Sequence, residues 1–418
     1  MKLERLYLQA FRNYEEQTLI LSPEKNLFIG QNGQGKTNLL EAIYILSHTQ
    51  SNRTHQEKEL MRLKEEKLGS GREEALCTTI LGDIIETDGD KRTLEVQYYR
   101  QILAQGIMEA SPLSALSAGR LKTRFKQNGV LLKSRSQFLG YLPSVSFFLS
   151  DLLLLRGAPE ERRRWLDAAI TQIDKGHLAI VSHYQKIKTQ KSRLLKEPYG
   201  SVSEAHLEVW NLQLATAAAK LCAARLLYLS KIETLTSAHY AELSGGDAAL
   251  SFSYQAAVLE GIQEAKALNT LVFDEKTLED AYLNLLERRK MDELRRGTCL
   301  VGPHRDDIAF YLGGLEAQRF GSQGQQRTIV LALKLSELCL LRQTRQLQPI
   351  LLLDDVMAEL DLSRQQFLIQ HLNADTQVLM TTTHMDQSWH RLFKSQEEEV
   401  FEVVSGKVLP YATRALSL

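Results

Sequence analysis

Gly30-Gln31-Asn32-Gly33-Gln34-Gly35-Lys36-Thr37 is the stretch that decides the fold of this chain, because it has the full spacing G-x-x-x-x-G-K-T. It follows an apolar run, Asn26–Ile29, and precedes a helix-like segment, Asn38–Leu46. A strand, a glycine-rich loop and a helix in this order form a phosphate-binding loop. Its N–H groups surround a β-phosphate, Lys36 neutralises the β and γ oxygens, and the Thr37 hydroxyl binds Mg²⁺. The pattern therefore predicts a nucleotide site with Mg²⁺; the alternative is a glycine-rich turn without a ligand.

The second half of such a site is predicted at Ile350–Asp355, where four apolar residues end in two carboxylates. A buried strand of this kind delivers Asp354 to the Mg²⁺ ion, so Thr37 and Asp354 are the predicted metal ligands. Asp355 is the candidate that orients or deprotonates the attacking water. Lys36, Asp354 and Asp355 are thus the candidate catalytic residues. The alternative is that the two acids only cap a strand.

A small, polar, glycine-containing segment precedes the helix-like run Thr328–Leu341. It predicts another anion-binding helix N-terminus, because the free N–H groups and the dipole of a helix favour negative charge there. Beside the two nucleotide motifs it resembles the signature motif of ABC-type ATPases, which acts on the nucleotide of the opposite subunit. Its residues are Ser322, Gln323, Gly324 and Gln325.

Two short polar segments follow the acidic strand. Asp361 ends the segment Glu359–Asp361, which resembles the D-loop at the dimer interface of ABC-type ATPases. Thr383 and His384 end the next strand-like run, where such ATPases place a γ-phosphate switch. For His384 the alternative is an ordinary surface histidine.

Charge is balanced over the whole chain but not along it. The 51 Lys and Arg residues equal the 51 Asp and Glu residues in number, so a nucleic-acid role requires local charge. Two stretches, Ala110–Ser150 and Lys175–Lys196, each contain six basic residues and no acid. Phosphate neutralisation needs unpaired cations, so these stretches are the predicted DNA-binding segments. The alternative for each is a solvated face paired with acids elsewhere in the fold. The candidates are Arg120, Lys122, Arg124, Lys126, Lys186, Lys188, Lys191 and Arg193.

Proline positions outline the organisation of the chain. None of the eight prolines lies between Pro198 and Pro303, which predicts that this interval is mostly helix. Apolar residues recur near helical spacing from about His206 to Leu243, which would form a rod of roughly 55 Å. Apolar runs outside the rod, Cys299–Val301 among them, predict buried strands. The predicted fold is α/β, with one domain split in sequence by an inserted helical arm.

Composition favours a globular protein of a reducing compartment. The four cysteines lie far apart and form no C-x-x-C pair, so neither a zinc knuckle nor a disulfide framework is predicted. Hydrophobic residues make up 44% and charged residues 24%, and the length suggests two or three domains. Met1–Tyr14 alternates like a strand and lacks the apolar core of a signal peptide, and the most apolar stretch, Phe147–Leu155, is too short to span a bilayer. We therefore expect a cytoplasmic protein with no membrane partner.

Together these motifs resemble the RecF family of bacteria, SMC-like recombination mediators with an ABC-type ATPase head. The resemblance also rests on Phe11-Arg12-Asn13-Tyr14, on Gly157–Asp167 and on Gly302–Asp307, and it runs through nearly the whole chain. It implies a P-loop ATPase head of two lobes with an inserted helical domain. The implied divisions are lobe I with the phosphate-binding loop at 1–150, the helical arm at 151–297, and lobe II at 298–418.

The resemblance implies a function as well. A RecF-like chain is a weak, DNA-stimulated ATPase that binds ATP and Mg²⁺, closes as a homodimer around two ATP molecules and holds single-stranded, duplex or gapped-junction DNA. With RecO and RecR it helps to load RecA in replication-linked DNA repair and the SOS response. By the same resemblance Arg12 and Asn13 lie near the nucleotide; the alternative is that they only form a hairpin turn.

Two rival classes are weighed against this interpretation. An ABC transporter nucleotide-binding domain would have a compact subdomain between Thr37 and Ser322, where this chain has a basic, helix-rich insertion. A chromosome-structural SMC-type ATPase would need heptads sustained over many turns, far longer than the single candidate rod. A third alternative is that this chain binds ATP but hardly hydrolyses it.

Overall fold

The two ends of the chain fold into one unit, and its middle forms another. The computed structural model describes residues 1–54, 56–62, 77–101, 120–198, 202–262, 274–370, 375–384 and 398–411. Unit 1 comprises Met1–Ser150 and Gln346–Leu418, and unit 2 comprises Asp151–Arg345. The chain thus divides at 150/151 and 345/346, and residues 298–345 pack within unit 2. The division into two lobes and a helical arm stays a prediction.

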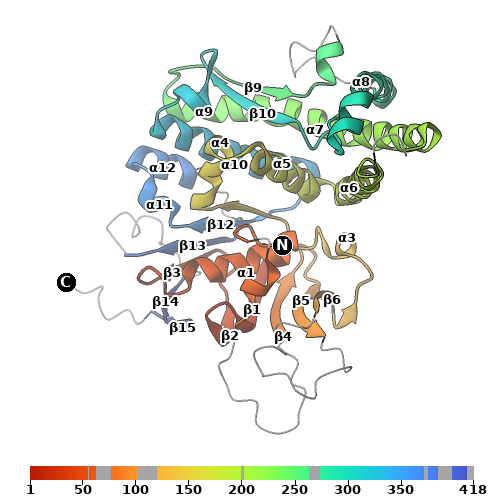
Figure 1. Cartoon of the computed structure of the whole chain (residues 1–418). Helices are drawn as coiled ribbons and strands as arrows, with labels where there is room; N and C mark the ends of the chain where they lie inside the picture. The colour runs from red at the N-terminus through yellow and green to blue at the C-terminus, as the bar shows by residue number, and fades with distance from the viewer. Residues whose placement is uncertain are drawn as a thin grey trace. The chain divides into compact units, whose positions relative to one another are not determined.

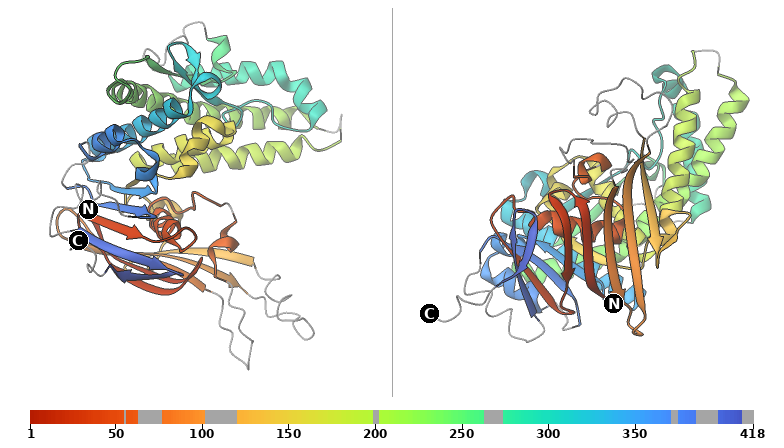
Figure 2. Two further views of the ribbon diagram at one scale, coloured as in Figure 1. Left: turned by 90° about the vertical axis from the view of Figure 1, so that its left-hand side faces the viewer. Right: turned by 90° about the horizontal axis from the view of Figure 1, so that it is seen from below.

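Unit 1 contains an antiparallel sheet, sheet A, in the order β2-β1-β4-β5-β6-β7 (Figures 1 and 2). Apolar and polar residues alternate along β1, and Leu3, Leu6 and Leu8 are buried. This alternation places one face of the sheet on a core. The strands are β1 (Lys2–Phe11), β2 (Tyr14–Ile20), β4 (Cys77–Ile85), β5 (Lys91–Gln101), β6 (Arg120–Gln127) and β7 (Val130–Leu131).

Sheet B, also in unit 1, has the order β15-β14-β3-β13-β12-β8. All neighbours run parallel except β14 and β15, which form an antiparallel hairpin. The carboxyl ends of its parallel strands therefore meet at one edge, which is where α/β sheets bind ligands. The strands are β3 (Lys25–Ile29), β8 (Ser144–Phe147), β12 (Ile350–Asp354), β13 (Val378–Thr382), β14 (Glu398–Val404) and β15 (Lys407–Pro410).

Helix α1 (Lys36–His48) lies between the two sheets of unit 1 (Figure 1). It packs against β4 and β5 of sheet A and against β8, β12 and β13 of sheet B. Leu39, Leu40, Ile43 and Leu46 are buried in one cluster with residues of both sheets. The short elements of unit 1 are η1 (Glu57–Leu60), α3 (Arg135–Phe138), α11 (Val356–Glu359) and α12 (Leu362–Gln370).

Unit 2 is built around helix α7 (Glu204–Ser244), which confirms the predicted long helix. It ends where Gly245 adopts φ 73°, a conformation that glycine accepts at little cost. Its most apolar window could span a membrane by length and composition, but 61% of that window is buried, and α7 packs against α6, α8 and α10. The helices are α4 (Leu153–Arg156), α5 (Pro159–Ile173), α6 (His177–Leu194), α8 (Glu275–Arg296), α9 (Ala317–Phe320) and α10 (Gln323–Arg345).

A three-stranded sheet, sheet C, completes unit 2, and the segment before it corrects one prediction. Its order is β11 (Leu315–Glu316), β10 (Asp307–Leu312), β9 (Leu250–Gln255). Strand β9 lies in the interval predicted to be mostly helix, and that prediction is confirmed, because α7 and α8 fill most of the interval. Cys299–Val301 is not a strand, although Cys299 and Val301 are buried. A three-residue apolar run records burial, and burial alone does not distinguish a strand from a packed turn.

The segment Gly302–Asp307 forms a buried polar network in unit 2. The Tyr254 hydroxyl donates to Asp306 at 2.7 Å, and Arg225 donates to Tyr254 and to the Pro303 carbonyl. His304 lies between the Tyr184 hydroxyl, 2.5 Å from Nδ1, and the Cys299 carbonyl, 3.3 Å from Nε2. The carbonyl can only accept, so Nε2 carries a proton, and in the neutral ring Nδ1 then accepts from the Tyr184 hydroxyl. This site suits a neutral imidazole.

Burial lowers the pKa of His304 from 6.5 to about 4. The contribution of the neutral His304 to the unfolding free energy is therefore fully present above pH 6.5, and it is lost as the pH falls towards 4. Burial raises the pKa of Asp306 to about 6, which gives the opposite trend in the same range. Comparing wild type with His304→Gln therefore isolates the histidine. Between pH 7 and pH 5 we expect urea denaturation to show that wild type loses about 2 kcal/mol more unfolding free energy than the variant. Equal losses would contradict the neutral histidine.

Candidate nucleotide site

The predicted phosphate-binding loop joins β3 to α1 at the carboxyl edge of sheet B. Gly33 and Gly35 have φ angles of 81° and 118°, which only glycine adopts without strain. The ammonium of Lys36 turns back to the loop and donates to the carbonyls of Gly30 at 2.5 Å and Gln31 at 3.1 Å. The positive group therefore lies inside the loop, where the motif predicts a phosphate.

Thr37, Asp354 and Thr381 meet on a single carboxylate oxygen. The Thr37 hydroxyl donates to Asp354 Oδ1 at 2.9 Å, and the Thr381 hydroxyl donates to the same atom at 2.8 Å. The three residues come from the start of α1, the end of β12 and the end of β13. The parallel pairing of β12 with β13 places Asp354 beside Thr381, and the packing of α1 against β12 brings in Thr37, which is 317 positions from Asp354 in sequence.

The two predicted metal ligands, Thr37 and Asp354, fit a divalent cation. A threonine hydroxyl and a carboxylate are hard oxygen ligands of the kind that Mg²⁺ prefers. Burial raises the pKa of Asp354, while hydrogen bonds from Thr381 and Thr37 and the charges of Arg53 and Lys36 lower it. A buried carboxylate that is costly to ionise is stabilised by a cation placed against it.

Burial lowers the pKa of Lys36, and the charges of Asp355 and Asp354 raise it. Asp355, the candidate for positioning water, has φ 55° and donates its N–H to the Thr381 hydroxyl at 2.9 Å. Its left-handed backbone follows the last residue of β12 directly. The three candidate catalytic residues therefore lie together at one edge of sheet B, and their roles stay predictions.

Arg12 and Asn13 form the turn between β1 and β2, as the hairpin alternative has it. They also contact the phosphate-binding loop and α1. Asn13 Nδ2 donates to the Gln34 carbonyl at 2.8 Å, and Arg12 makes two hydrogen bonds to Glu41 at 2.7 and 3.0 Å. The hairpin turn is thus part of the loop's support, and direct contact with a nucleotide stays a prediction.

Arg53 and Glu41 are residues of the site that the sequence analysis missed. Glu41 is fully buried in α1 and pairs with both Arg12 and Arg53. Arg53 also donates to Asn38 Oδ1 at 2.7 Å, and its charge lowers the pKa of Asp354. A lone arginine after a helix carries no spacing signal. One signal in the sequence pointed to Glu41: a glutamate in the middle of an otherwise apolar helix is buried and therefore requires a partner.

The predicted D-loop and switch residues lie in unit 1 with the site. Thr383 and His384 follow β13, and the Thr383 hydroxyl lies 2.8 Å from His384 Nδ1. The neighbouring Thr382 carbonyl accepts from the Gly30 N–H at 3.3 Å, so this segment adjoins the start of the loop. Asp361 is exposed and accepts from the Arg364 N–H at 2.9 Å, and the side chain of Glu359 lies outside the described residues.

The predicted signature segment lies in unit 2 at the start of α10. Ser322 and Gln325 form a reciprocal cap: the Gln325 N–H donates to Ser322 Oγ at 3.2 Å, and the Ser322 N–H donates to Gln325 Oε1 at 2.9 Å. Ser322 and Gln323 are exposed, and Gly324 is half-buried. The cap accounts for the serine structurally and leaves its action on a nucleotide as a prediction.

The first basic stretch lies on β6, at one side of sheet A. Lys122 and Arg124 are exposed on the same face, and the Arg124 guanidinium lies 4.0 Å from the centre of the Tyr99 ring. Lys126 follows on that face but pairs with Glu95 at 3.1 Å. The backbone of Arg120 begins the strand, whereas its side chain lies outside the described residues.

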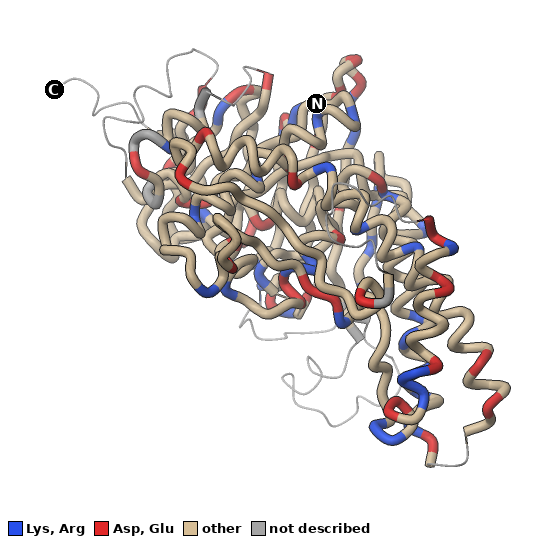
Figure 3. The backbone as a smooth tube through the Cα atoms, turned by 90° about the horizontal axis from the view of Figure 1, so that it is seen from above, with Lys and Arg blue, Asp and Glu red and all other residues tan. Residues whose placement is uncertain are grey.

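The second basic stretch lies on α6, and one of its candidates is wrong. Lys186 and Arg193 are exposed and Lys188 is half-buried. Lys191 is fully buried and pairs with Glu293 of α8 at 2.6 Å, so it cannot contact DNA in this structure. An acid-free stretch of sequence is not an acid-free surface, because the partner comes from another helix. Figure 3 shows the same mixing of Lys and Arg with Asp and Glu along the chain.

The buried Lys191–Glu293 pair gives a stability test. Lys191→Met leaves the Glu293 carboxylate buried without its cation, so we expect the unfolding free energy to fall by about 3 kcal/mol. Lys186→Met, on the exposed face of the same helix, should change it by less than about 0.5 kcal/mol. Urea denaturation of both variants measures the difference. Equal effects would mean that the pair is not formed.

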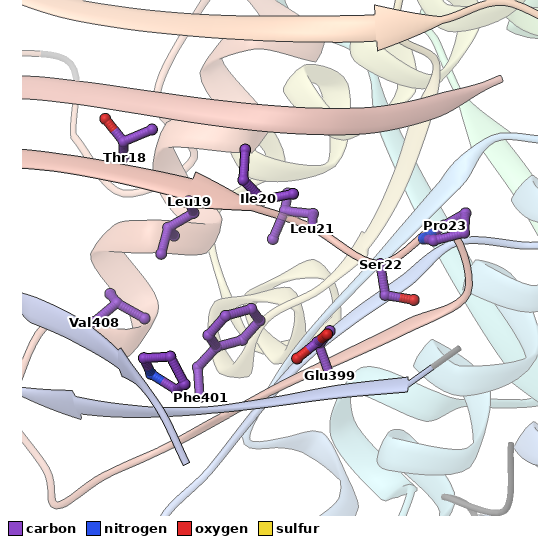
Figure 4. A pocket seen from close by; sticks show the side chains of 10 residues that line it. Thr18, Leu19, Ile20, Leu21, Ser22, Pro23, Glu399, Phe401 and Val408 are labelled. Atoms are coloured by element: carbon purple, nitrogen blue, oxygen red, sulfur yellow. The ribbon is translucent and has the colours of Figure 1, made fainter. Parts of the chain in front are cut away.

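A cavity of about 670 Å³ in unit 1 lies away from the phosphate-binding loop. Figure 4 shows Leu19 of β2 facing Phe401 of β14 and Val408 of β15. Its lining residues are Thr18, Leu19, Ile20, Leu21, Ser22, Pro23, Glu399, Phe401, Val408 and Pro410. None of these is basic, so the lining offers no cation to a phosphate and this cavity is not the nucleotide site.

Comparison with known proteins shows the family of this chain. The family described as RecF/RecN/SMC N terminal domain matches residues 2–398. A relative from Synechococcus sp. (strain JA-3-3Ab), named DNA replication and repair protein RecF, is 35% identical over 415 residues, with 98% of each chain covered. A solved structure of the recombination mediator protein RecF with ATP, in the RecFOR pathway, has 29% identity, a TM-score of 0.82 and 98% coverage of each chain.

A second solved structure is an SMC head bound to the C-terminal winged-helix domain of ScpA, with a TM-score of 0.50, 13% identity, and coverage of 99% of this chain and 98% of that one. At this identity the likeness shows the fold alone. The relatives thus favour the recombination mediator over the transporter and the chromosome-structural ATPase. The chain belongs to the RecF family of DNA replication and repair proteins and has the ABC-type ATPase fold of that family.

Proposed function

We propose that this chain is an ATP-dependent recombination mediator that binds ATP with Mg²⁺ and uses nucleotide-driven dimerisation to hold DNA. The observation that carries the proposal is the convergence of Thr37, Asp354 and Thr381 beside the Lys36 ammonium. Mg²⁺ supplies charge neutralisation at the phosphate oxygens when it is bound. Family membership supports the rest, because the solved RecF relative is described with ATP and as a recombination mediator.

Each group at the site has a distinct task in this proposal. Lys36 leaves the loop carbonyls and donates to the β and γ oxygens of ATP. Thr37 and Asp354 hold the metal, and Thr381 keeps the Asp354 carboxylate oriented through its 2.8 Å hydrogen bond. Asp355 accepts a hydrogen bond from the attacking water and orients it.

The signature segment acts from the second subunit. Ser322 and the N–H groups at the start of α10 approach the γ-phosphate held by the partner, because a helix N-terminus favours an anion. Asp361 lies at the same interface, and Thr383 and His384 sense the γ-phosphate. Two such contacts per dimer make closure depend on ATP. Hydrolysis then removes the γ-phosphate and reopens the dimer, so that the ATPase times the release of DNA.

The dimer is tested by sedimentation with and without ATP. Wild type should shift from monomer to dimer on addition of ATP and Mg²⁺. Lys36→Met should stay monomeric, because the loop loses the ammonium that is proposed to bind the phosphates of ATP. Asp355→Asn should still dimerise but hydrolyse ATP at least tenfold more slowly, since it lacks the group that positions water.

Asp88→Asn is the matched control, because Asp88 lies in the exposed β4–β5 turn. It should dimerise and release phosphate like wild type. A dimer that forms equally with and without ATP would overturn the proposal. Unchanged turnover in Asp355→Asn would remove Asp355 from the mechanism and leave the dimer standing.

DNA contact is proposed at the exposed cations Lys122, Arg124, Lys186 and Arg193 of β6 and α6, and at the half-buried Lys188 of α6. The described part of β6 presents Lys122 and Arg124 without an acidic partner in an ion pair. Lys191 is no longer a candidate for DNA contact, because it is buried and paired with Glu293. Lys126 is a weaker candidate, because it pairs with Glu95. Contacts of this kind bind phosphates and carry no base sequence, so single-stranded, duplex and gapped DNA are all substrates.

Reversing two charges on β6 tests this placement. Lys122→Glu with Arg124→Glu should weaken DNA binding in the presence of ATP at least tenfold and flatten its dependence on salt, since fewer counterions are released. Lys231→Glu, an exposed reversal on α7, is the control. A fluorescence-anisotropy salt series with and without ATP measures both effects. Affinity unchanged by the double reversal would show that DNA binds elsewhere.

The partners follow from family membership and remain part of the proposal. A cytoplasmic RecF-like protein would act with RecO and RecR, and through them on RecA. The solved relative is described in the RecFOR pathway, which supports this choice of partners.

A further inference from the structure

The phosphate-binding loop is held from outside by a hairpin near the other end of the chain. Strands β14 and β15 are joined by the two-residue turn Ser405-Gly406, between the paired residues Val404 and Lys407. The Ser405 N–H donates to Gln34 Oε1 at 2.6 Å, and the Gly406 N–H donates to the Gln34 carbonyl at 3.0 Å. One loop residue thus accepts hydrogen bonds from both residues of the turn.

The packing around the loop also leaves no room for a Cβ atom at Gly406 or Gly30. A Cβ atom on Gly406 would collide with the carbonyl oxygen of Asn13, whose side chain donates to the same Gln34 carbonyl at 2.8 Å. At the start of the loop, a Cβ on Gly30 would collide with the Val403 carbonyl of β14. The loop therefore packs against β14 at its start and against both hairpin turns at Gln34.

This arrangement fixes the direction of a loop peptide. The structure contains no cis peptide bond among the described residues, so the Gln34 carbonyl and the Gly35 N–H point in opposite directions. The Gly406 and Asn13 donors hold the carbonyl towards the hairpins. The Gly35 N–H is therefore directed to the opposite side, and N–H groups of this loop are what would bind phosphate.

We propose that the Ser405-Gly406 turn is a positioning element of the ATP site, which preorganises the phosphate-binding loop through Gln34. The inference rests on the proposed ATP binding and deepens it: residues remote in sequence from every nucleotide motif set the affinity for ATP. Preorganisation raises affinity because the bound conformation of the loop is already populated before the ligand arrives.

The chain contains a matched control turn. Asn128-Gly129 joins β6 to β7 with φ angles of 48° and 78°, and Ser405-Gly406 has 48° and 73°. An alanine at either glycine meets the same left-handed strain. Only at Gly406 does the new Cβ collide with the residue that supports the loop, because nothing lies within 4 Å of a Cβ at Gly129.

Titration with a fluorescent ATP analogue tests the proposal on wild type, Gly406→Ala and Gly129→Ala. We expect Gly406→Ala to raise the Kd for the nucleotide at least tenfold and Gly129→Ala to leave it within twofold. Turnover at saturating ATP should fall far less than kcat/KM in Gly406→Ala, because positioning of the loop affects binding first. Urea denaturation of both variants confirms that they are folded.

Two further measurements keep the test decisive if Gly406→Ala does not fold. Gln34→Met removes the acceptor of the Ser405 N–H and should also weaken ATP binding. In the double variant, the increase in Kd should differ from the product of the two single increases, because both changes act on the same contact. In wild type, ATP should slow hydrogen exchange of the Ser405 and Gly406 amides, because fixing the loop fixes their acceptor.

The outcomes separate the two proposals. If wild type does not bind the nucleotide, the proposed function fails. If wild type binds it, and Gly406→Ala and Gly129→Ala have equal affinities or ATP leaves the exchange of the turn unchanged, the positioning role is overturned while ATP binding stands.

Discussion

Burial of α1 between two sheets is the constraint that positions the candidate nucleotide site. Leu39, Leu40, Ile43 and Leu46 form one cluster with residues of sheets A and B, so both sides of the helix are in apolar contact. A helix held in this way cannot rotate or slide without opening the core. Its first residues, Lys36 and Thr37, therefore have fixed positions, and the Thr37 hydroxyl donates to the carboxylate at the end of β12 at 2.9 Å.

The polar contacts around α1 work on the same principle. Glu41 is buried in this helix, and the arginines that neutralise it come from the β1–β2 turn and from the segment after the helix. The same β1–β2 turn and the β14–β15 turn hold the Gln34 carbonyl. The groups proposed to bind phosphate thus stand on a rigid support assembled from both ends of the chain, and this support lowers the reorganisation needed when a ligand binds.

Unit 2 differs in how it is stabilised. Its core surrounds α7, and polar groups buried within it are joined into networks, such as Arg225 with Tyr254 and Asp306, or Lys191 with Glu293. Such pairs are costly when one partner is removed. They explain why a basic stretch of sequence is an unreliable guide to a basic surface: Lys191 supports the fold, while Lys186 on the same helix is exposed.

The sequence by itself determined the phosphate-binding loop, the strand ending in Asp354, the long helix and the family, because each depends on local spacing or on motifs read in order. It did not determine strand β9 or show that Cys299–Val301 is not a strand, because short apolar runs indicate burial and not backbone conformation. Only the tertiary structure decided that Thr381 shares the Asp354 oxygen, that Glu293 neutralises Lys191, and that Ser405 and Gly406 hold Gln34. These contacts join residues far apart in the chain, and their geometry follows from sheet order and helix packing, which no local pattern encodes.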